Sequence, residues 1–397
     1  MSDTTTDTKI FTKQSVGILM LSLLTMATGI VSPAANAIRE SFPEISQTMA
    51  DQVASIPSFA MAVFIVVSSW IVRKVGTKKT VLIGLWMVII STVLSLVAWN
   101  IWVLLGARLL LGAGLGTYNS LAVSLITVSY QGDRQSRLLG WQNAFQGIGA
   151  TVGSILVSLL LLLNWHAVFA IYLVAVLVLI FYQAHVPDIP LAGDTAETAD
   201  SNAPTTTNWW VVAGSGVMTF VLMTSYMVSV VKLPEYLKVY DIANASVSSL
   251  LIGAINFVVI IAGIAYGRVF AALRYHTITL ATALMAVAYL LLALSPSLVS
   301  AVVSCVLIGF AFGFFVPWTF GAASNATSAA NSDNVTKVMM VLNNLANFLA
   351  PFTVIALLMG HAANSLTTVF LNGFIVLVVV LVIVVALAFV NAARSRK

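Results

Sequence analysis

The stretch RLLLGAGLG occupies residues 108–116, inside an apolar run that extends from residue 101 to residue 125. Gly112 and Gly116 form a small-xxx-small pair, a pattern that lets two transmembrane helices approach each other closely. Arg108 lies about seven residues from one end of the run, roughly 10 Å deep at ~1.5 Å per residue. A charge at this depth is costly in lipid, so Arg108 is expected to face the interior of a helix bundle and to have partners there.

The rest of the chain has the same apolar character. Of its 397 residues, 60% are hydrophobic and 8% are charged, whereas soluble domains carry roughly 25% charged residues. This composition excludes a single soluble core. The net charge is +5, but the basic residues lie between apolar runs and not on one polar face, so nucleic acid is not an expected partner. The single cysteine, Cys305, excludes an intrachain disulfide and a multi-thiolate metal site.

Polar, charged and proline residues divide the chain into twelve apolar segments, each near the roughly 20 residues that a bilayer of about 30 Å requires. Runs of this length suit helices better than the short alternating strands of a barrel. The sequence therefore predicts an all-α membrane protein with twelve transmembrane helices. The predicted spans are 15–38, 50–72, 80–99, 101–125, 138–162, 165–185, 209–232, 247–270, 277–294, 298–322, 337–359 and 366–391.

The spans form two sets of six. We expect an N-terminal six-helix bundle at residues 1–186, a cytoplasmic linker at 187–208 and a C-terminal six-helix bundle at 209–397. The linker is rich in Asp, Glu, Thr, Ala and Pro and has no Lys or Arg, which is typical of a flexible segment. A regulatory docking segment is the alternative interpretation of this composition.

Lysine and arginine predict the orientation, because positive residues near span ends are retained in the cytoplasm. Fourteen of them fall at the ends that share a side with the N-terminus, and three fall at the opposite ends. Both termini are therefore predicted to be cytoplasmic, and the protein is expected in the cytoplasmic (plasma) membrane.

The two sets of six are related by an internal repeat. Gly112 and Gly116 in the fourth span are matched by Gly309 and Gly313 in the tenth, at one offset (309 − 112 and 313 − 116 both give 197). A duplicated bundle of this kind is a recurrent transporter architecture, with the substrate held near the midplane between the halves.

At residues 108–116 the chain resembles the major facilitator superfamily, whose fourth helix carries an Arg followed by glycines at this spacing. The turn SWIVRKVGTKK at residues 69–79 looks like the basic loop of that family. Trp165 and Phe169 resemble its Trp-Arg-x-x-Phe pattern, with His166 in place of the Arg. The resemblance implies the fold of that superfamily, secondary transport and coupling to protons. It assigns a gating role to the basic loop residues Arg73, Lys74, Gly76, Lys78 and Lys79.

Two departures from the family pattern affect what the resemblance implies. The basic loop has Ser69 where the family has Gly and Arg73 where it has Asp, so the carboxylate that helps to lock the inner gate is missing. The fifth span lacks the Gly-Pro pair of many antiporters, which weakens an antiport assignment.

Neutral amides inside the spans are the best candidates for a binding site, because they are costly when they face lipid. Pairs at i,i+4 spacing place one polar stripe on the fifth helix and one on the eleventh. We weigh two roles for these amides, contact with the transported solute and hydrogen bonding between helices. Aromatic side chains are expected to add walls to the same cavity. The predicted cavity residues are Arg108, Asn119, Gln142, Asn143, Gln146, Tyr226, Asn256, Trp318, Asn343 and Asn347.

Two interpretations of Arg108 stay open. In the first it is a cavity cation that contacts an anionic group or modulates proton transfer. In the second it is a structural residue that bonds to the backbone of the neighbouring first span.

Acidic residues are absent from the middle of every predicted span. Because proton-coupled transporters commonly use buried carboxylates as relays, either coupling involves a group near a span end or protons are not strongly coupled. The candidates are Asp51, Glu235 and His166, although His166 is also explained as a packing residue at a helix start.

No catalytic motif is evident, whether a phosphate-binding loop, paired His ligands or a nucleophile elbow. The sequence therefore predicts a transporter and not an enzyme, with no cofactor or metal. We expect a monomer in the lipid bilayer that moves a small neutral or anionic organic solute by alternating access. The alternatives are a multidrug efflux antiporter and a lipid-handling or sensor protein with the same fold.

Overall fold

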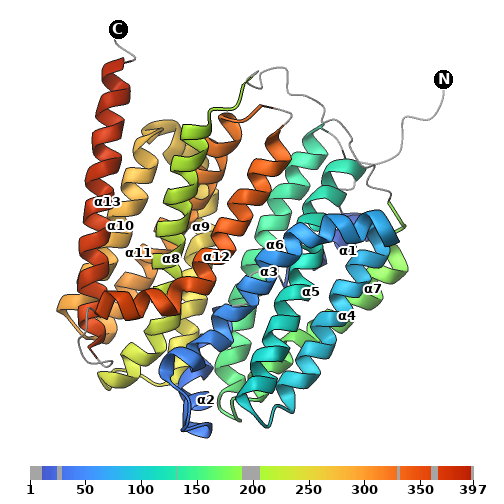
Figure 1. Cartoon of the computed structure of the whole chain (residues 1–397), viewed down its shortest axis with the longest axis horizontal. Coiled ribbons are helices and arrows are strands. Elements are labelled where there is room, and N and C mark those ends of the chain that lie inside the picture. The colour runs from blue at the N-terminus through green and yellow to red at the C-terminus, as the bar shows by residue number, and fades with distance from the viewer. Residues whose placement is uncertain are drawn as a thin grey trace.

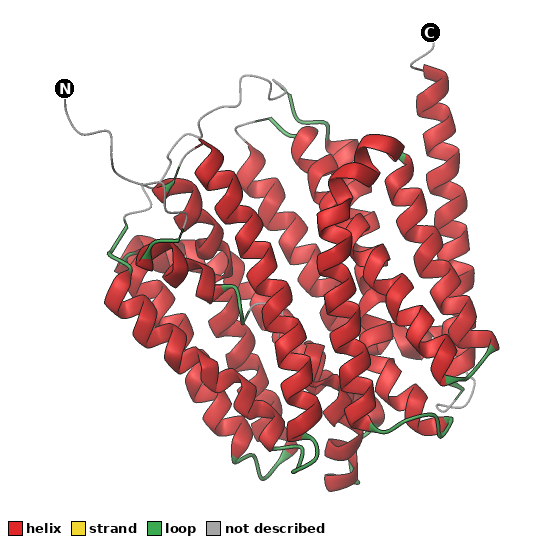
Figure 2. Ribbon diagram, turned by 180° about the vertical axis from the view of Figure 1, so that it is seen from behind, coloured by secondary structure: helices red, strands yellow, loops and turns green. Residues whose placement is uncertain are grey.

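The computed structural model describes residues 11–24, 29–130, 132–189, 206–328, 331–358 and 365–394. All regular elements in these ranges are helices, which run side by side in one bundle (Figures 1 and 2). Eleven helical segments of the described residues are long and apolar enough to cross a membrane. The helices are α3 (Gln47–Val75), α4 (Thr77–Leu96), α5 (Ile101–Ser129), α6 (Gly132–Leu160), η2 with α7 (Ala167–Leu173 and Val174–His185), α8 (Trp209–Val239), α9 (Ala245–Leu273), α10 (His276–Leu294), α11 (Leu298–Asn325), α12 (Ser332–Leu358) and α13 (Leu366–Arg394).

The first predicted span is not one continuous helix. Its described residues form α1 (Lys13–Leu21), a turn, the 3₁₀ segment η1 (Gly29–Ala34) and α2 (Ala35–Ser41). Pro33 inside η1 has no N–H to donate, and Gly29 four residues earlier favours non-helical backbone. The predicted helix at 15–38 is therefore corrected to a broken segment.

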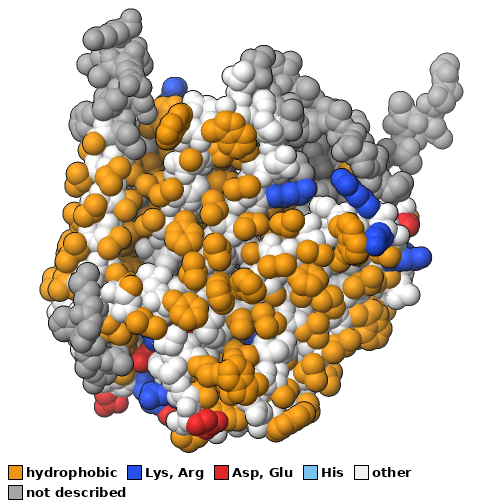
Figure 3. All heavy atoms as spheres, in the orientation of Figure 1, with side chains coloured by type: hydrophobic (Ala, Val, Ile, Leu, Met, Phe, Trp, Pro, Cys, Tyr) orange, Lys and Arg blue, Asp and Glu red, His pale blue; other side chains and the backbone are white. Residues whose placement is uncertain are grey.

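The outer surface of the bundle is apolar. In the face of Figure 3, hydrophobic side chains cover the middle, and charged side chains gather toward the two ends. Trp99 at one end is 74% exposed and Trp210 at the other is 89% exposed, as expected for aromatic residues at the two membrane interfaces. Following the predicted topology, we call the end with α2, at the bottom of Figure 1, the outer end and the opposite end the inner end.

Two hydrophobic core clusters fill the interior. One contains buried residues from Ile18 to Val186, and the other contains buried residues from Leu222 to Val384. We call the two sets of helices the N-terminal and C-terminal halves. The most apolar window of α5 is 67% buried and that of α11 is 61% buried, against 33% for α13. The fourth helix is therefore the most buried spanning helix of each half, and α13 lies at one edge of the bundle in Figure 1.

The duplicated glycines make equivalent contacts in the two halves. A Cβ atom added at Gly112 would lie 1.9 Å from the Pro57 carbonyl oxygen of α3, and one at Gly309 would lie 2.7 Å from Val258 Cβ of α9. In each half, the fourth helix thus packs on the second helix through the first glycine of the repeated pair.

Two hydrogen bonds repeat at the same offset of 197 residues. Ser91 Oγ donates to the Ala107 carbonyl at 2.7 Å, and Ser304 Oγ donates to the Ala288 carbonyl at 3.0 Å. The positions correspond (288 − 91 and 304 − 107 both give 197), with donor and acceptor exchanged. The third and fourth helices of both halves are therefore joined at the same point, in agreement with the predicted duplication.

Candidate gate and solute site

Three charged residues meet at the outer end, between the two halves. Lys232 Nζ of α8 lies 2.6 Å from Asp51 Oδ2 of α3 and 2.6 Å from Glu235 Oε2 of its own helix. Gln47 Nε2 donates to the other Asp51 oxygen at 3.1 Å. The side chain of Asp51 is fully buried, and those of Lys232 and Glu235 are 5% and 12% exposed. We call Asp51, Lys232 and Glu235 the outer ion cluster.

The local sequence explains one of the two ion pairs in this cluster. Lys232 and Glu235 are three residues apart, which places them on one face of a helix. The sequence placed the end of this span at residue 232, whereas α8 continues through Pro234 to Val239. Lys232 was thus the last residue of the predicted span, whereas the longer helix buries it against α3.

The outer ion cluster carries two carboxylates for one ammonium group, so its formal charge is −1 when all three groups are ionised. Desolvating such groups is expensive, and removal of one partner leaves an uncompensated buried charge. Of the three predicted coupling residues, the structure brings Asp51 and Glu235 together.

Further polar contacts join the halves at the outer end. They connect α2 and η1 to α8, and α6 to α9. They are the ion pair between Glu40 and Lys238, and hydrogen bonds from Ser32 Oγ to the Val230 carbonyl (2.9 Å), from Ser158 Oγ to the Ser246 carbonyl (2.9 Å) and from Ser249 Oγ to the Ser154 carbonyl (2.6 Å). The outer end is therefore closed along two seams between the halves.

His166 lies apart from the outer ion cluster. Its ring stacks on Trp165 with centroids 3.5 Å apart, and its Nε2 lies 3.1 Å from the Ala98 carbonyl oxygen. Trp165 Nε1 donates to Ser41 Oγ at 2.8 Å. His166 thus connects the start of η2 to the turn between α4 and α5, all within the N-terminal half.

The helices that carry the predicted amide stripes lie at the junction of the halves. On α6, a Cβ atom added at Gly147 would lie 2.5 Å from Ile260 of α9. On α12, Phe348 contacts Phe59 of α3, with ring centroids 5.0 Å apart. Gln146 is the neighbour of Gly147 in sequence, and Asn347 is the neighbour of Phe348.

None of the predicted amides with a described side chain is exposed. Gln142 is 4% exposed and Asn347 is 8% exposed. Asn256 Nδ2 donates to the Ile252 carbonyl of its own helix at 3.0 Å. Asn347 Oδ1 is a buried acceptor without a partner among the described residues. The partly buried amides are Asn119, Gln146, Asn256 and Asn343, and the side chain of Asn143 lies outside the described residues.

The two predicted aromatic residues lie in the C-terminal half. Tyr226 of α8 contacts Phe312 of α11, with ring centroids 4.4 Å apart. Trp318 of α11 packs against the C-terminal core. Both side chains are partly buried.

Arg108 is 1% exposed and contacts protein groups of its own half. Its Nε donates to the Val53 carbonyl at 2.8 Å, and its Cζ lies 5.5 Å from the ring centroid of Phe169 and 5.2 Å from that of Tyr172. The Val53 carbonyl belongs to α3, the second span, and is a partner that the structural interpretation did not name. That interpretation placed the partner on the first span, of which residues 25–28 lie outside the described residues.

The basic loop contacts a carboxylate that the sequence did not indicate. Gly76 has a φ of +85°, which favours glycine at this turn into α4. Asp188, just beyond α7, accepts a hydrogen bond from the Lys78 backbone N–H at 3.2 Å, and Lys78 Nζ donates to the Gln183 carbonyl at 3.0 Å. An anion at a helix N-terminus is stabilising there. Asp188 and the Gln183 carbonyl therefore hold the loop within the N-terminal half.

Three other residues of the basic loop, for which the resemblance implies a gating role, lie at the inner surface. Arg73, Lys74 and Lys79 are exposed. Lys74 Nζ lies 3.8 Å from the ring centroid of Trp70.

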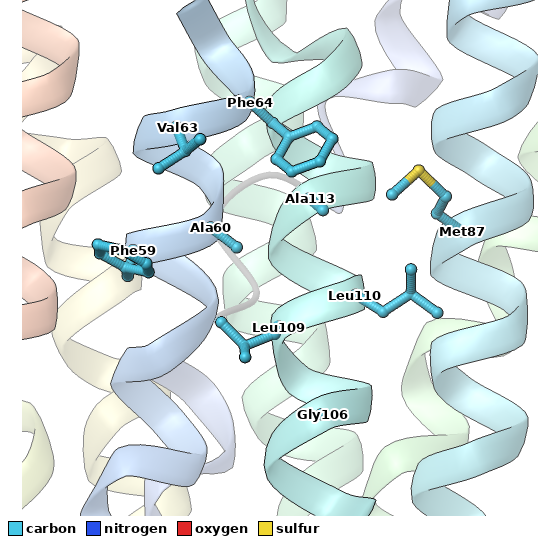
Figure 4. A pocket seen from close by; sticks show the side chains of 9 residues that line it. All are labelled: Phe59, Ala60, Val63, Phe64, Met87, Gly106, Leu109, Leu110 and Ala113. Carbon is cyan, nitrogen blue, oxygen red and sulfur yellow. The ribbon is translucent and has the colours of Figure 1, made fainter. Parts of the chain in front are cut away.

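An apolar groove of about 390 Å³ lies between α3, α4 and α5 (Figure 4). Phe59 and Val63, which line it, are 42% and 43% exposed on the outside of the bundle. Its walls carry no polar side chain, so it is a lipid-facing surface and not the predicted passage. Among the described residues, no three His, Cys, Asp or Glu side chains are close enough together to hold a metal ion.

The sequence profile of the Major Facilitator Superfamily matches residues 17–351, and the chain belongs to this family of transporters. No curated protein sequence matches. Three of the solved structures that share the fold are named here. They are the nucleoside transporter NupG (TM-score 0.75, 13% identity, 94% of this chain and 99% of that one), the peptide transporter POT (0.77, 12%, 95% and 94%) and an inward-facing bacterial homologue of the human lysosomal transporter Spinster (0.67, 15%, 95% and 95%).

Proposed function

We propose that the protein is a secondary active transporter that moves a small neutral or anionic organic solute across the cytoplasmic membrane by alternating access. The observation that carries this proposal is the outer ion cluster, in which Asp51 of one half and Lys232 of the other are buried against each other. Buried ion pairs contribute little net stability compared with apolar packing. An ion pair at the junction of two bundles is better explained as a contact that forms and breaks during transport.

The side chains at the junction support a neutral or anionic solute. The amide stripes of α6 and α12 offer hydrogen-bond donors and acceptors, and both carboxylates of the outer ion cluster already contact Lys232. A polycation would have no carboxylate available there. The likeness to proteins named as nucleoside and peptide transporters supports a polar organic solute.

We also propose that protons are coupled to the movement through Asp51 and Glu235. When the outer end opens, water reaches these groups, and when it closes they are desolvated with a formal charge of −1. Uptake of one proton neutralises the cluster, so protonation and outer closure favour each other.

The amide stripes provide a test in proteoliposomes with an inward proton gradient. We expect uptake of at least one of radiolabelled uridine, dialanine and gluconate by the parent protein. Gln146→Leu and Asn343→Leu should each lower that uptake about fivefold or more, because loss of one hydrogen bond to a desolvated solute costs about 1–3 kcal/mol. The matched control is Gln183→Leu, an exposed amide at the inner end of α7, which should change uptake less than twofold.

The alternatives give different results in the same vesicles. Export of structurally unrelated lipophilic dyes, without uptake of polar solutes, would replace the proposal with multidrug efflux. Movement of lipid without solute flux would favour a lipid-handling protein. Equal uptake by Gln146→Leu, Asn343→Leu and Gln183→Leu would remove the amide stripes from the solute site.

A further inference from the structure

Two helices at the outer end contain a proline that interrupts their hydrogen bonding. Pro57 lies inside α3 and Pro234 lies inside α8. In an α-helix the N–H of each residue donates to the carbonyl four residues earlier, and proline has no N–H. The carbonyls of Val53 and Val230 therefore lack their normal helical donors.

Both of these carbonyls accept a hydrogen bond from a side chain of another segment. Arg108 Nε of α5 donates to the Val53 carbonyl at 2.8 Å. Ser32 Oγ of η1 donates to the Val230 carbonyl at 2.9 Å, across the junction of the halves. Because an unpaired buried carbonyl is costly, each bond compensates for a proline.

Both compensated carbonyls are next to the outer ion cluster. Asp51 is two residues before Val53 on α3, and Lys232 is two residues after Val230 on α8. Two residues span roughly 3 Å along a helix. The bond that holds the Val53 carbonyl therefore also fixes the position of Asp51 against Lys232.

A second contact with α5 lies at the same proline. A Cβ atom at Gly112 would lie 1.9 Å from the Pro57 carbonyl oxygen, so the backbones of α5 and α3 touch there. Gly112 is one turn from Arg108 on α5. This helix thus holds α3 both at the proline and at the carbonyl that the proline leaves without a donor.

We propose that Arg108 is a positioning residue of the outer gate, which holds the segment of α3 before Pro57 so that Asp51 meets Lys232. The segments of α3 before Pro57 and of α8 after Pro234 are then two gate segments hinged at prolines. This inference rests on the proposed alternating access, but its test needs no solute, so its failure is distinguishable from a failure to find transport.

The test measures how fast a cysteine in the closed seam reacts from outside. Ser32→Cys in a Cys305→Ala background places one thiol at the junction, where Ser32 is 1% exposed. The probe is a membrane-impermeant maleimide added to sealed vesicles with the outer end facing outward. Arg108→Met in this background should raise the labelling rate about tenfold or more, because one charged hydrogen bond is worth about 1.5–3 kcal/mol.

Restoring the missing donor should reverse this effect. Pro57→Ala returns an N–H that can donate to the Val53 carbonyl, so Arg108→Met with Pro57→Ala should label at least threefold more slowly than Arg108→Met alone. The matched control is Pro317→Ala on α11, a helix proline away from the outer gate, which should leave the raised rate unchanged.

Two results would overturn the inference. One is an unchanged labelling rate in Arg108→Met, which is the result expected if Arg108 only binds solute. The other is a raised rate that Pro57→Ala fails to lower. If Arg108→Met does not fold, Pro57→Ala in the Ser32→Cys background tests the proline hinge by itself. With a continuous α3 the outer end should open less often, so the thiol should be labelled more slowly than in the background without Pro57→Ala. Unchanged or faster labelling would then reject the proline hinge.

Discussion

Lys232→Met is expected to abolish stable closure of the outer end. The substitution keeps the length of the side chain but leaves Asp51 and Glu235 buried without a cation, which costs about 3–5 kcal/mol. At about 1.4 kcal/mol per tenfold change, the closed state should lose at least a hundredfold of its population relative to the open state. The measurement is the labelling rate of the Ser32→Cys reporter, together with the midpoint of thermal unfolding in detergent.

The matched control for Lys232 is Lys238, six residues further along α8. Lys238 pairs with Glu40, but their side chains are 54% and 66% exposed, and exposed ion pairs are worth little. Lys238→Met should therefore change labelling less than threefold. Adding Asp51→Asn and Glu235→Gln to Lys232→Met removes the buried charges and should restore most of the closed population. If Lys232→Met and Lys238→Met behave alike, the outer ion cluster is not the gate.

Gly112→Ala is expected to separate α5 from α3 and to unfold the N-terminal half at a lower temperature. The added Cβ would lie 1.9 Å from the Pro57 carbonyl oxygen and 2.6 Å from its carbonyl carbon, both rigid backbone atoms. Overpacking of this kind typically costs about 1–3 kcal/mol and occasionally more. The measurement is the fraction of monodisperse protein that survives heating.

Gly106→Ala, on the same helix, is the control for Gly112→Ala. No atom lies within 4 Å of a Cβ added at Gly106, and alanine is favoured over glycine in a helix interior by roughly 0.5–1 kcal/mol. Gly106→Ala should therefore be neutral or slightly stabilising. Equal thermal stability of the two variants would contradict the close approach of α5 and α3.

The fold was predictable because its main determinants are local in the sequence. Run length and polarity predicted all the helices after the first span, and the repeated glycines predicted that the halves are related. The break in the first span was missed, because an apolar run of sufficient length outweighed the signal from Pro33. The extension of α8 was missed because a lysine and a proline together are typical of a helix end.

The site was less predictable because it depends on pairs that are distant in sequence. Asp51 and Glu235 were proposed for coupling from their type and position, but nothing in the sequence pairs Asp51 with Lys232, 181 residues away. The hydrogen bond from Ser32 to the Val230 carbonyl and the contact of Asp188 with the basic loop also depend on how distant segments pack together. One signal was available in the sequence, since Pro57 predicts an unpaired Val53 carbonyl, although it does not predict that Arg108 supplies the donor.

Alternating access requires the outer seam between the halves to open in every transport cycle. A Cβ atom added at Gly253 of α9 would lie 3.1 Å from Ser154 Cβ of α6, slightly shorter than the 3.5–4.5 Å of a disulfide. Ser154→Cys with Gly253→Cys, in a Cys305→Ala background, is therefore expected to form a disulfide on oxidation that locks this seam.

The decisive measurement is uptake by that variant in proteoliposomes, using whichever of uridine, dialanine and gluconate the parent moves. Uptake is compared before oxidation, after oxidation and after reduction, with the two single-cysteine variants as controls. We expect oxidation to stop uptake in the double variant alone and reduction to restore it. Undiminished uptake by fully cross-linked protein would show that transport does not need this seam to open.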